Sequence, residues 1–439
     1  MKICLIDLEH PIEGFANRDQ TGGFGSKMLS QGLIGKLLAN LKKDRIRIPL
    51  ITFAYMSAIA KQYHHECKIS SEAKVEADLI IIATSMIHWK YEVEAAIKVR
   101  KINPKSKIGF CGPFCSEYPE KFRKYCDFIM IGEPEYLFRD ICTGKINPTQ
   151  NLYSTDEVDL DQLPFPDWSE FCVDHFGYSP SMRNKPFLTI LGSRGCPFAC
   201  EFCPYIVSQG VKLRRRENSN IIKEINYLIK NYKIKSLLFR DIIWSMDLKA
   251  TKDLCKLLIR EQFDIEIAVE TRPEMIDYEL ITLLKQAGIK VVNLGIESPN
   301  ANILEQSGRK AFSNDKVKLI IDELHRNNIK VQAFYIIGLL DDTDESVLNT
   351  INYSKFLNTY AAQFCVFTPF PGTKTFQDVK ERLLTDDFSK FTEYFPVVKI
   401  NHLSSKQILN YLNKAYNEYY TRPNWILKYG PSVLKSFLS

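Results

Sequence analysis

The chain has 439 residues, of which 45% are hydrophobic and 25% charged, and its formal net charge is +6. This length allows two or three domains around a large core, and the composition is ordinary for a globular protein. The densest basic run, Lys212-Leu-Arg-Arg-Arg216, is short, so no nucleic-acid partner is predicted. No apolar stretch reaches the ~18 residues typical of a membrane span, and no signal sequence is evident at the N-terminus. We therefore expect a soluble, cytoplasmic protein without a transmembrane segment.

The first part of the chain alternates short apolar runs with helical patterns. Strands are predicted at 2–7, 77–83, 107–110 and 127–131. Helices are predicted near 27–41, 49–63 and 89–102. Continuous Ile, Val and Leu runs are typical of buried parallel strands, and their alternation with helices indicates a doubly wound sheet. Residues 1–149 are therefore predicted to form a Rossmann-like domain.

A glycine-rich loop, Thr21-Gly-Gly-Phe-Gly-Ser26, follows the first predicted strand. When such a loop joins a strand to a helix, its backbone N–H groups can cradle an anionic group. The loop is short, and its sequence alone does not assign it a role.

Residues 150–185 interrupt the alternation, because Asp161-Gln-Leu-Pro-Phe-Pro-Asp167 carries two prolines and no clean periodicity. This stretch is predicted to be the interdomain linker. Beyond it, strands are predicted at 187–191, 236–239, 266–269, 291–294, 331–336 and 362–367. Helices are predicted at 219–231, 248–262, 277–287, 315–327, 344–358 and 405–420. The fold class is therefore α/β, with a partial (β/α)6 TIM-like barrel over 186–400 and a helical C-terminal extension over 401–439. In such a barrel the chemistry lies at the carboxyl ends of the strands.

Three of the cysteines lie close together directly after the first predicted barrel strand: Cys196, Cys200 and Cys203. Three thiolates can bind three irons of a cubane cluster, which leaves the fourth iron open to a substrate. A zinc site would need a fourth Cys or His nearby in a paired spacing, which is missing. The cysteine density is also far below that of disulfide-rich secreted proteins. The other nine cysteines are scattered and are interpreted as small buried hydrophobic residues.

The spacing C-x3-C-x2-C, with Phe202 before the last cysteine, resembles the signature of the radical S-adenosylmethionine (SAM) superfamily. The resemblance implies a [4Fe-4S] cluster whose open iron chelates the amino and carboxylate groups of SAM. It also implies reductive cleavage of SAM to a 5′-deoxyadenosyl radical, with electrons from an external donor such as flavodoxin or ferredoxin. Phe202 is then a SAM contact.

The same resemblance assigns further SAM contacts to the ends of the barrel strands. Asp241 is expected to receive the SAM ammonium, with helix N-capping as the structural alternative. Arg272 is expected either to pair with the SAM carboxylate or to form a salt bridge with a nearby Glu. Glu297 is expected to bind the ribose hydroxyls or the amino group, beside Ser298. Gly338 belongs to a turn that lies near adenine in the superfamily.

The first domain resembles the cobalamin-binding domain that precedes many radical SAM cores. The stretches that carry this resemblance are 77–85, 109–116 and 127–135. It places Ser85, Cys111 and Gly112 at a corrin ring. The Asp-x-His-x-x-Gly loop of such domains is missing, and Asp7-Leu-Glu-His10 stands near its place with another spacing, so no lower axial histidine is expected. A domain that keeps this fold without the cofactor is the alternative.

The likeness extends from about 46 to 423, where Tyr419-Tyr-Thr-Arg-Pro423 is similar to the element that ends many of these proteins. It implies a cobalamin-dependent, class B methyltransferase-like enzyme that methylates an unactivated carbon of a small-molecule or lipid substrate. Two alternatives remain: a radical cyclisation or rearrangement without methyl transfer, and a non-catalytic homologue that binds a cluster. No residue pattern indicates the substrate or the oligomeric state.

Overall fold

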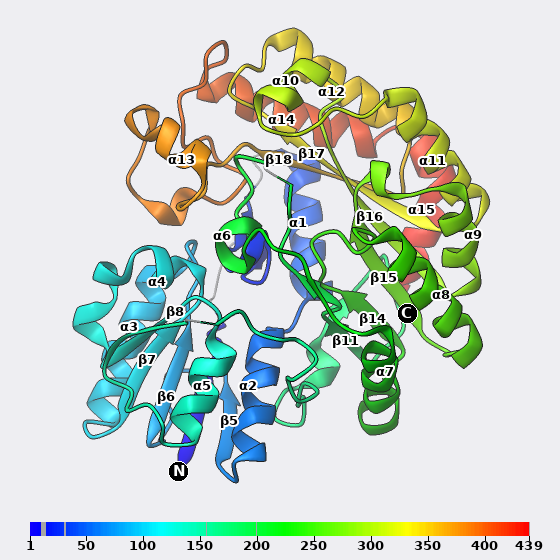
Figure 1. Ribbon diagram of the computed structural model, residues 1–439. Helices are drawn as coiled ribbons and strands as arrows, with labels where there is room; N and C mark the ends of the chain where they lie inside the picture. Colours follow the sequence, from blue (N-terminus) through cyan, green and yellow to red (C-terminus); the bar gives the residue numbers. More distant parts are fainter. Residues whose placement is uncertain (10–14, 30–31, 155, 199, 439) are drawn as a thin grey trace.

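The computed structural model describes residues 1–9, 15–29, 32–154, 156–198 and 200–438. His10, which the sequence placed near a missing motif, lies outside these residues. Two six-stranded parallel sheets, each flanked by helices, form the body of the molecule (Figure 1). The mixed α/β class predicted from the sequence is confirmed.

The first sheet has the strand order β5-β1-β6-β7-β8-β9. Its strands are β1 (Lys2–Ile6), β5 (Glu66–Ser70), β6 (Leu79–Ala83), β7 (Lys107–Cys111), β8 (Phe128–Ile131) and β9 (Gln150–Tyr153). Its helices are α2 (Ile51–Gln62), α3 (Trp89–Ile102), the short α4 (Pro113–Glu117) and α5 (Pro134–Cys142). Every residue of β6 is buried, which explains its uninterrupted apolar sequence. The Rossmann-like arrangement expected for this part of the chain is present.

The segment between β1 and α2 departs from the predicted pattern. Strands β2 (Phe15–Asn17) and β3 (Ser26–Met28) pair as an antiparallel hairpin, with the glycine-rich stretch at its tip. The helix expected near 27–41 begins later, as α1 (Leu33–Arg45), because residues 26–28 are held by β2. The glycine-rich loop therefore leads into a strand, and not directly into the N-terminus of a helix, where an anion could be cradled.

The second sheet has the order β11-β14-β15-β16-β17-β18. Its strands are β11 (Phe187–Ile190), β14 (Ser236–Phe239), β15 (Glu266–Thr271), β16 (Ile289–Glu297), β17 (Lys330–Ile337) and β18 (Ala361–Val366). The helices outside it are α7 (Asn218–Tyr232), α8 (Leu248–Glu261), α9 (Tyr278–Gln286), α10 (Ala301–Gln306), α11 (Asn314–Arg326), α12 (Asp344–Leu357) and α14 (Ser405–Tyr420). Within the described residues β11 does not pair with β18, so this half barrel is open. After β18 the chain forms α13 (Lys374–Asp378), then α14, and finally α15 (Pro423–Leu438).

The stretch predicted to be a linker is packed into the interior. Trp168 is fully buried and lies against Phe171. Asp167 accepts a hydrogen bond from the Ser57 hydroxyl of α2 at 2.6 Å and pairs with Lys61 at 2.8 Å. Strand β10 (Gly177–Tyr178) pairs with β4 (Ile46–Arg47). These contacts join the connection to both parts of the molecule, so it is not a free tether.

Across the described ranges, no helix combines the length and the apolar character that a bilayer crossing requires.

Candidate active site

The three cysteines lie on a loop that leaves the carboxyl end of β11. The base of this loop is closed by a short antiparallel ladder between β12 (Ser193–Arg194) and β13 (Arg214–Arg215). The Cys196 amide donates to the Gly210 carbonyl at 3.2 Å. Gly195 has a φ of +86°, and a Cβ there would lie 2.0 Å from the Lys212 carbonyl oxygen, so only glycine fits. We call residues 193–215 the cluster loop.

The cluster loop has the donor set of an iron–sulfur site. Burial raises the pKa of all three thiols, to about 12 for Cys203, whose deprotonation the two other cysteines also oppose. Without a cation these groups stay protonated, whereas a bound metal stabilises the thiolates. Among the described side chains no three Cys, His, Asp or Glu converge on a single ion. In a cubane each thiolate would bind a different iron, so the three cysteines of this loop offer three of the four thiolates that usually hold such a cluster.

Asp241 lies at the end of β14 and fixes the start of the cluster loop. Its carboxylate accepts hydrogen bonds from the Gly192 amide at 2.8 Å and the Ser193 hydroxyl at 2.6 Å. Burial raises its pKa to about 6, against the effect of these two donors. The N-cap of the following helix is Asp247, whose side chain accepts from Ala250, so Asp241 does not have the capping role considered above. A contact with SAM remains a prediction.

Arg272, at the end of β15, forms the salt bridge that the sequence left open as an alternative. Its Nε lies 2.8 Å from Glu274, and its guanidinium lies 4.5 Å from the ring centre of Phe198 in the cluster loop. The side chain is buried. The arginine therefore contacts the cysteine-bearing loop directly, and the SAM carboxylate stays a predicted second partner.

The other predicted SAM contacts lie at the ends of β16 and β17. Glu297 has a φ of +64° at a register shift in β16, and its carboxylate pairs with Arg309 at 2.6 Å. This backbone is strained for a residue with a side chain, which is typical of functional sites. Ser298 is buried beside it. The Gly338 amide donates to Asp342 at 2.9 Å in the turn after β17.

A small cavity of about 160 Å³ lies beside the last cysteine. Phe202 lines it, together with Leu340 and Asp341 from the turn after β17 and Phe367 after β18. The Phe202 and Phe367 rings meet edge to face with centroids 6.4 Å apart. Of the predicted SAM contacts, Phe202 is the one that lines this cavity.

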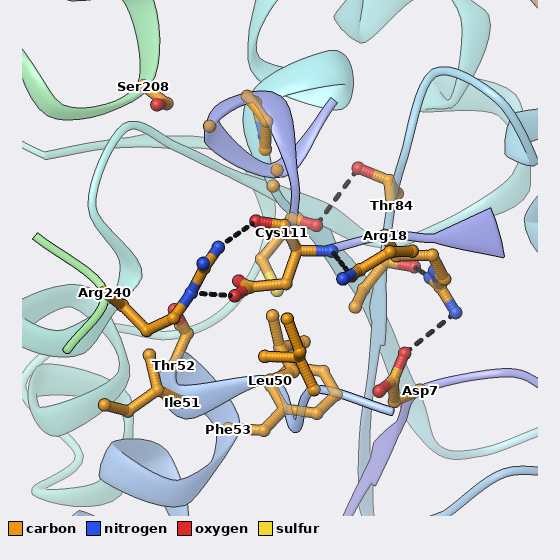
Figure 2. Close-up of a pocket in the computed structure, with 18 of the residues that line it drawn as sticks. Asp7, Arg18, Leu50, Ile51, Thr52, Phe53, Thr84, Cys111, Ser208 and Arg240 are labelled. Carbon is orange, nitrogen blue, oxygen red and sulfur yellow. Dashed lines mark hydrogen bonds and ion pairs between the residues drawn. The ribbon is translucent and has the colours of Figure 1, made fainter. Parts of the chain in front are cut away.

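A larger cavity of about 770 Å³ lies between the first sheet and the cluster loop. Asp7, Thr84, Cys111 and Gly112 line it from the ends of β1, β6 and β7, and Leu50 lines it from the start of α2 (Figure 2). Cys111 and Gly112, two of the predicted corrin contacts, thus line this cavity, and their contact with a corrin remains a prediction. Ser85 is fully buried beside this cavity and its hydroxyl donates to Glu92 at 2.9 Å, so Thr84 takes the lining position.

The hairpin β2–β3 brings charged groups into this cavity that sequence reasoning missed. Arg18 pairs with Asp7 at 2.9 Å, and Asp19 pairs with Arg240 of the barrel at 2.9 Å (Figure 2). Tyr205, two residues after Cys203, also lines the cavity. Arg240 directly precedes Asp241 at a strand end, a signal that was available in the sequence. The hairpin gave no such signal, because its partners lie far away in the chain.

Glu270, at the end of β15, is a further acidic group that was not singled out. Burial raises its pKa to about 7, the positive charge of Arg240 lowers it, and Glu297 raises it further. The strand ends of the barrel thus carry a protonatable carboxyl close to neutral pH.

The barrel matches a known family. Residues 190–353 match the sequence model of the Radical SAM superfamily, so this part of the chain is a radical SAM domain.

Similar proteins and structures extend the likeness beyond the barrel. The chain is 26% identical to an uncharacterized methyltransferase of Pyrococcus horikoshii, over 87% of this chain and 89% of the relative. It is 28% identical to the anaerobic magnesium-protoporphyrin IX monomethyl ester cyclase of Rubrivivax gelatinosus, over 82% of this chain and 70% of the relative. It shares a fold, with a TM-score of 0.65 and 13% identity, with the radical SAM methyltransferase TsrM of Kitasatospora setae, whose structure contains cobalamin and a [4Fe-4S] cluster. That match covers 87% of this chain and 74% of TsrM, so the shared fold includes both six-stranded sheets of this chain.

Proposed function

We propose that the chain is a radical SAM methyltransferase that holds a [4Fe-4S] cluster, SAM and cobalamin between its two domains. Cys196, Cys200 and Cys203 would bind the cluster. When bound, these cofactors supply a 5′-deoxyadenosyl radical and a transferable methyl group, for methylation of an unactivated carbon. The substrate class we propose is a small molecule or a lipid, and the electrons come from an external donor such as flavodoxin or ferredoxin.

The observation that carries this proposal is the position of the cluster loop. The loop leaves the carboxyl end of a barrel strand, and Tyr205 and Ser208, just beyond Cys203, line the 770 Å³ cavity. The opposite wall is made by the carboxyl ends of a parallel sheet, where ligands of doubly wound folds bind. A cofactor in this cavity would therefore lie next to the cluster loop.

The chain's own residues have defined tasks in this proposal. Asp241 holds the first residues of the cluster loop through Gly192 and Ser193. Arg272 supports the loop through Phe198 and offers a positive charge to a carboxylate.

A radical cyclisation is the second candidate function. It is favoured by the likeness to the Rubrivivax gelatinosus cyclase, whose sequence identity is as high as that of the methyltransferase relative. Cyclisation uses the same radical and the same cluster, and differs in what happens to the substrate radical. Mass analysis separates the two outcomes, because a methylated product gains one CH₂ and a cyclised product does not.

The cluster is tested by changing the three cysteines to Ala together and reconstituting the protein anaerobically with iron and sulfide. The visible absorption of a thiolate-bound cluster should appear in the unchanged chain and be absent from the variant. A matched control changes three partly or fully exposed cysteines outside the loop, Cys126, Cys172 and Cys365, which should leave the cluster intact. A triple loop variant that still holds a cluster and cleaves SAM would refute the assignment.

The cobalamin is tested by anaerobic incubation with hydroxocobalamin, desalting and an absorption spectrum. The matched variant is Leu50→Trp, which fills part of the larger cavity without touching the cluster loop. We expect the unchanged chain to retain corrin and the variant to lose it, with equal iron content in both. If the unchanged chain never retains corrin, the route through methylcobalamin is excluded.

A further inference from the structure

The base of the cluster loop is joined to the first domain by four buried or nearly buried charged side chains. Glu133 and Glu135 lie at the start of α5, in the turn that follows β8. Arg194 and Arg214 face each other across the ladder between β12 and β13. We call these four residues the charge clamp.

Arg194 makes the most buried contact of the charge clamp. It lies two residues before Cys196, and its guanidinium is 2.5 Å from one Glu135 oxygen and 3.2 Å from the other. Its second partner is Glu133, at 3.1 Å. The Glu135 side chain has no exposed surface, and that of Arg194 is 7% exposed. A forked arginine–carboxylate contact of this kind fixes orientation as well as distance.

Arg214 completes the charge clamp on the other strand of the ladder. Its two terminal nitrogens lie 2.6 Å and 2.7 Å from the two oxygens of Glu133. It also donates to the carbonyls of Val158 and Gln209, at 3.1 Å and 2.9 Å. One arginine thus ties together the first domain, the connection between the domains and the far end of the cluster loop.

The charges are matched inside the charge clamp. Burial works against ionisation of Glu133, yet the hydrogen bonds and positive charges of Arg214 and Arg194 hold its pKa below the usual value. Burial also opposes the charge on Arg194, but Glu135 and Glu133 raise its pKa. Removing one member of such a buried set leaves an uncompensated charge, which is far more costly than losing an exposed pair.

Two other ion pairs near the cluster loop serve as comparisons. Arg216 and Glu224 form an equally buried pair, 2.6 Å apart, but both belong to the barrel domain. Lys212 and Glu157 pair at 2.8 Å on the surface, with 71% and 53% of their side chains exposed. The charge clamp differs from both, because it is buried and crosses between the domains.

We propose that Glu133 and Glu135 are positioning residues that hold the cluster loop against the carboxyl end of the first sheet. Glu133, Glu135 and Arg194 line the larger cavity. The geometry of the clamp would therefore set where the cysteines lie relative to a cofactor in this cavity. The inference rests on the proposed function in that this spacing matters only if a cluster and a second cofactor meet there. The clamp itself is a property of the metal-free chain and is tested in it.

The test compares Glu135→Gln with the unchanged chain by amide hydrogen exchange of the metal-free protein. Gln keeps the shape of Glu and removes the charge. We expect exchange to rise about tenfold or more on both sides of the clamp, in residues 193–196 and in α5, because the two are coupled. Glu133→Gln, at a partly exposed position, is the second variant should the first fail to fold. Glu224→Gln should accelerate exchange in the barrel domain only. Glu157→Gln should accelerate exchange in neither domain.

A second measurement follows the relative position of the domains. Spin labels carried by unnatural amino acids at the exposed positions Lys98 of α3 and Lys249 of α8 report the distance between the domains. Glu135→Gln should broaden the distance distribution, and Glu224→Gln should leave it unchanged. Exchange that rises on one side only, or an unchanged distribution in Glu135→Gln, overturns the positioning role. Neither measurement needs a cofactor, so a chain that binds no corrin would defeat the proposed function without affecting this result.

Discussion

Replacing Gly195 by Ala should open the cluster loop more readily than replacing Gly210 by Ala. Both glycines belong to this loop and have a left-handed backbone, with φ of +86° and +82°. They differ in their surroundings. A Cβ at Gly195 would lie 2.0 Å from the Lys212 carbonyl oxygen and 2.8 Å from its carbon, whereas a Cβ at Gly210 would have nothing within 4 Å. A comparison of the two variants therefore separates the steric conflict with Lys212 from the preference of this backbone conformation for glycine.

The expected free energies follow from these contacts. The backbone of Gly210, with a φ of 82° and a ψ of 175°, costs an alanine about 1–3 kcal/mol, and the restricted unfolded chain returns about 0.4–1 kcal/mol. Gly210→Ala should therefore weaken the loop by at most about 2.6 kcal/mol. At Gly195 the Lys212 backbone must also move, and overpacking of this kind costs about 1–3 kcal/mol more. Gly195→Ala should therefore weaken the loop by about 1–3 kcal/mol more than Gly210→Ala, which corresponds to a difference of roughly 5-fold to 150-fold in the opening equilibrium.

The assay is amide exchange of the metal-free protein at Cys196 and Arg216. The Cys196 amide donates to Gly210, and the Arg216 amide donates to the Gly192 carbonyl at 2.9 Å, so both report opening of the ladder. Iron bound after reconstitution gives a second readout, which should fall further in Gly195→Ala than in Gly210→Ala. Equal exchange rates in the two variants would refute the steric argument.

Two further predictions concern stability. Because the pKa of Glu270 is raised to about 7 by burial, the folded state holds this proton more tightly than the unfolded state, and stability should be lost as pH rises from about 4.5 through 7. Glu270→Gln should remove this pH dependence and should be more stable than the unchanged chain at pH 8, by as much as ~3 kcal/mol. The measurement is urea unfolding of both proteins at pH 5 and pH 8. The same change of stability with pH in both proteins would contradict the prediction. Trp168→Ala should cost about 3–5 kcal/mol, because a fully buried aromatic side chain is lost from the connection between the domains. A thermal unfolding curve close to that of the unchanged chain would mean that the connection is a loose tether after all.

The sheets could be predicted from the sequence because their signal is local. A strand such as β6 is buried on both faces and therefore shows as an unbroken apolar run, and the parallel order follows from the alternation with helices. The cysteines were equally accessible, since their spacing is contained in eight residues. The helix after the glycine-rich stretch was predicted to begin too early, because a short strand comes before it. That outcome depends on pairing between Phe15 and Met28, which no short window of sequence reveals.

The candidate site was predictable in part for the same reason. Asp241 and Arg272 were found as strand-end residues, and the salt bridge of Arg272 with a nearby Glu was one of the alternatives, but the contacts of both residues with the cluster loop could not be derived. The contact of Arg272 with Phe198 and that of Arg240 with Asp19 join segments distant in the chain. Likewise, Glu133 and Glu135 were noticed only as part of a family-like stretch, since their meaning comes from arginines that follow some sixty residues or more later.

Helix α1 has a consequence for the order in which the chain can fold during synthesis. The Gly32 amide before it donates to Asn413 of α14 at 3.0 Å, Lys42 donates to Gln363 at 3.1 Å, and Arg45 donates to the Ser436 carbonyl at 2.5 Å. These contacts span more than three hundred residues, so the segment leaves the ribosome long before its partners exist. At roughly 5–20 residues per second, it waits for tens of seconds or so. The final contacts of α1 are therefore made late, after α14 and α15 have been synthesised.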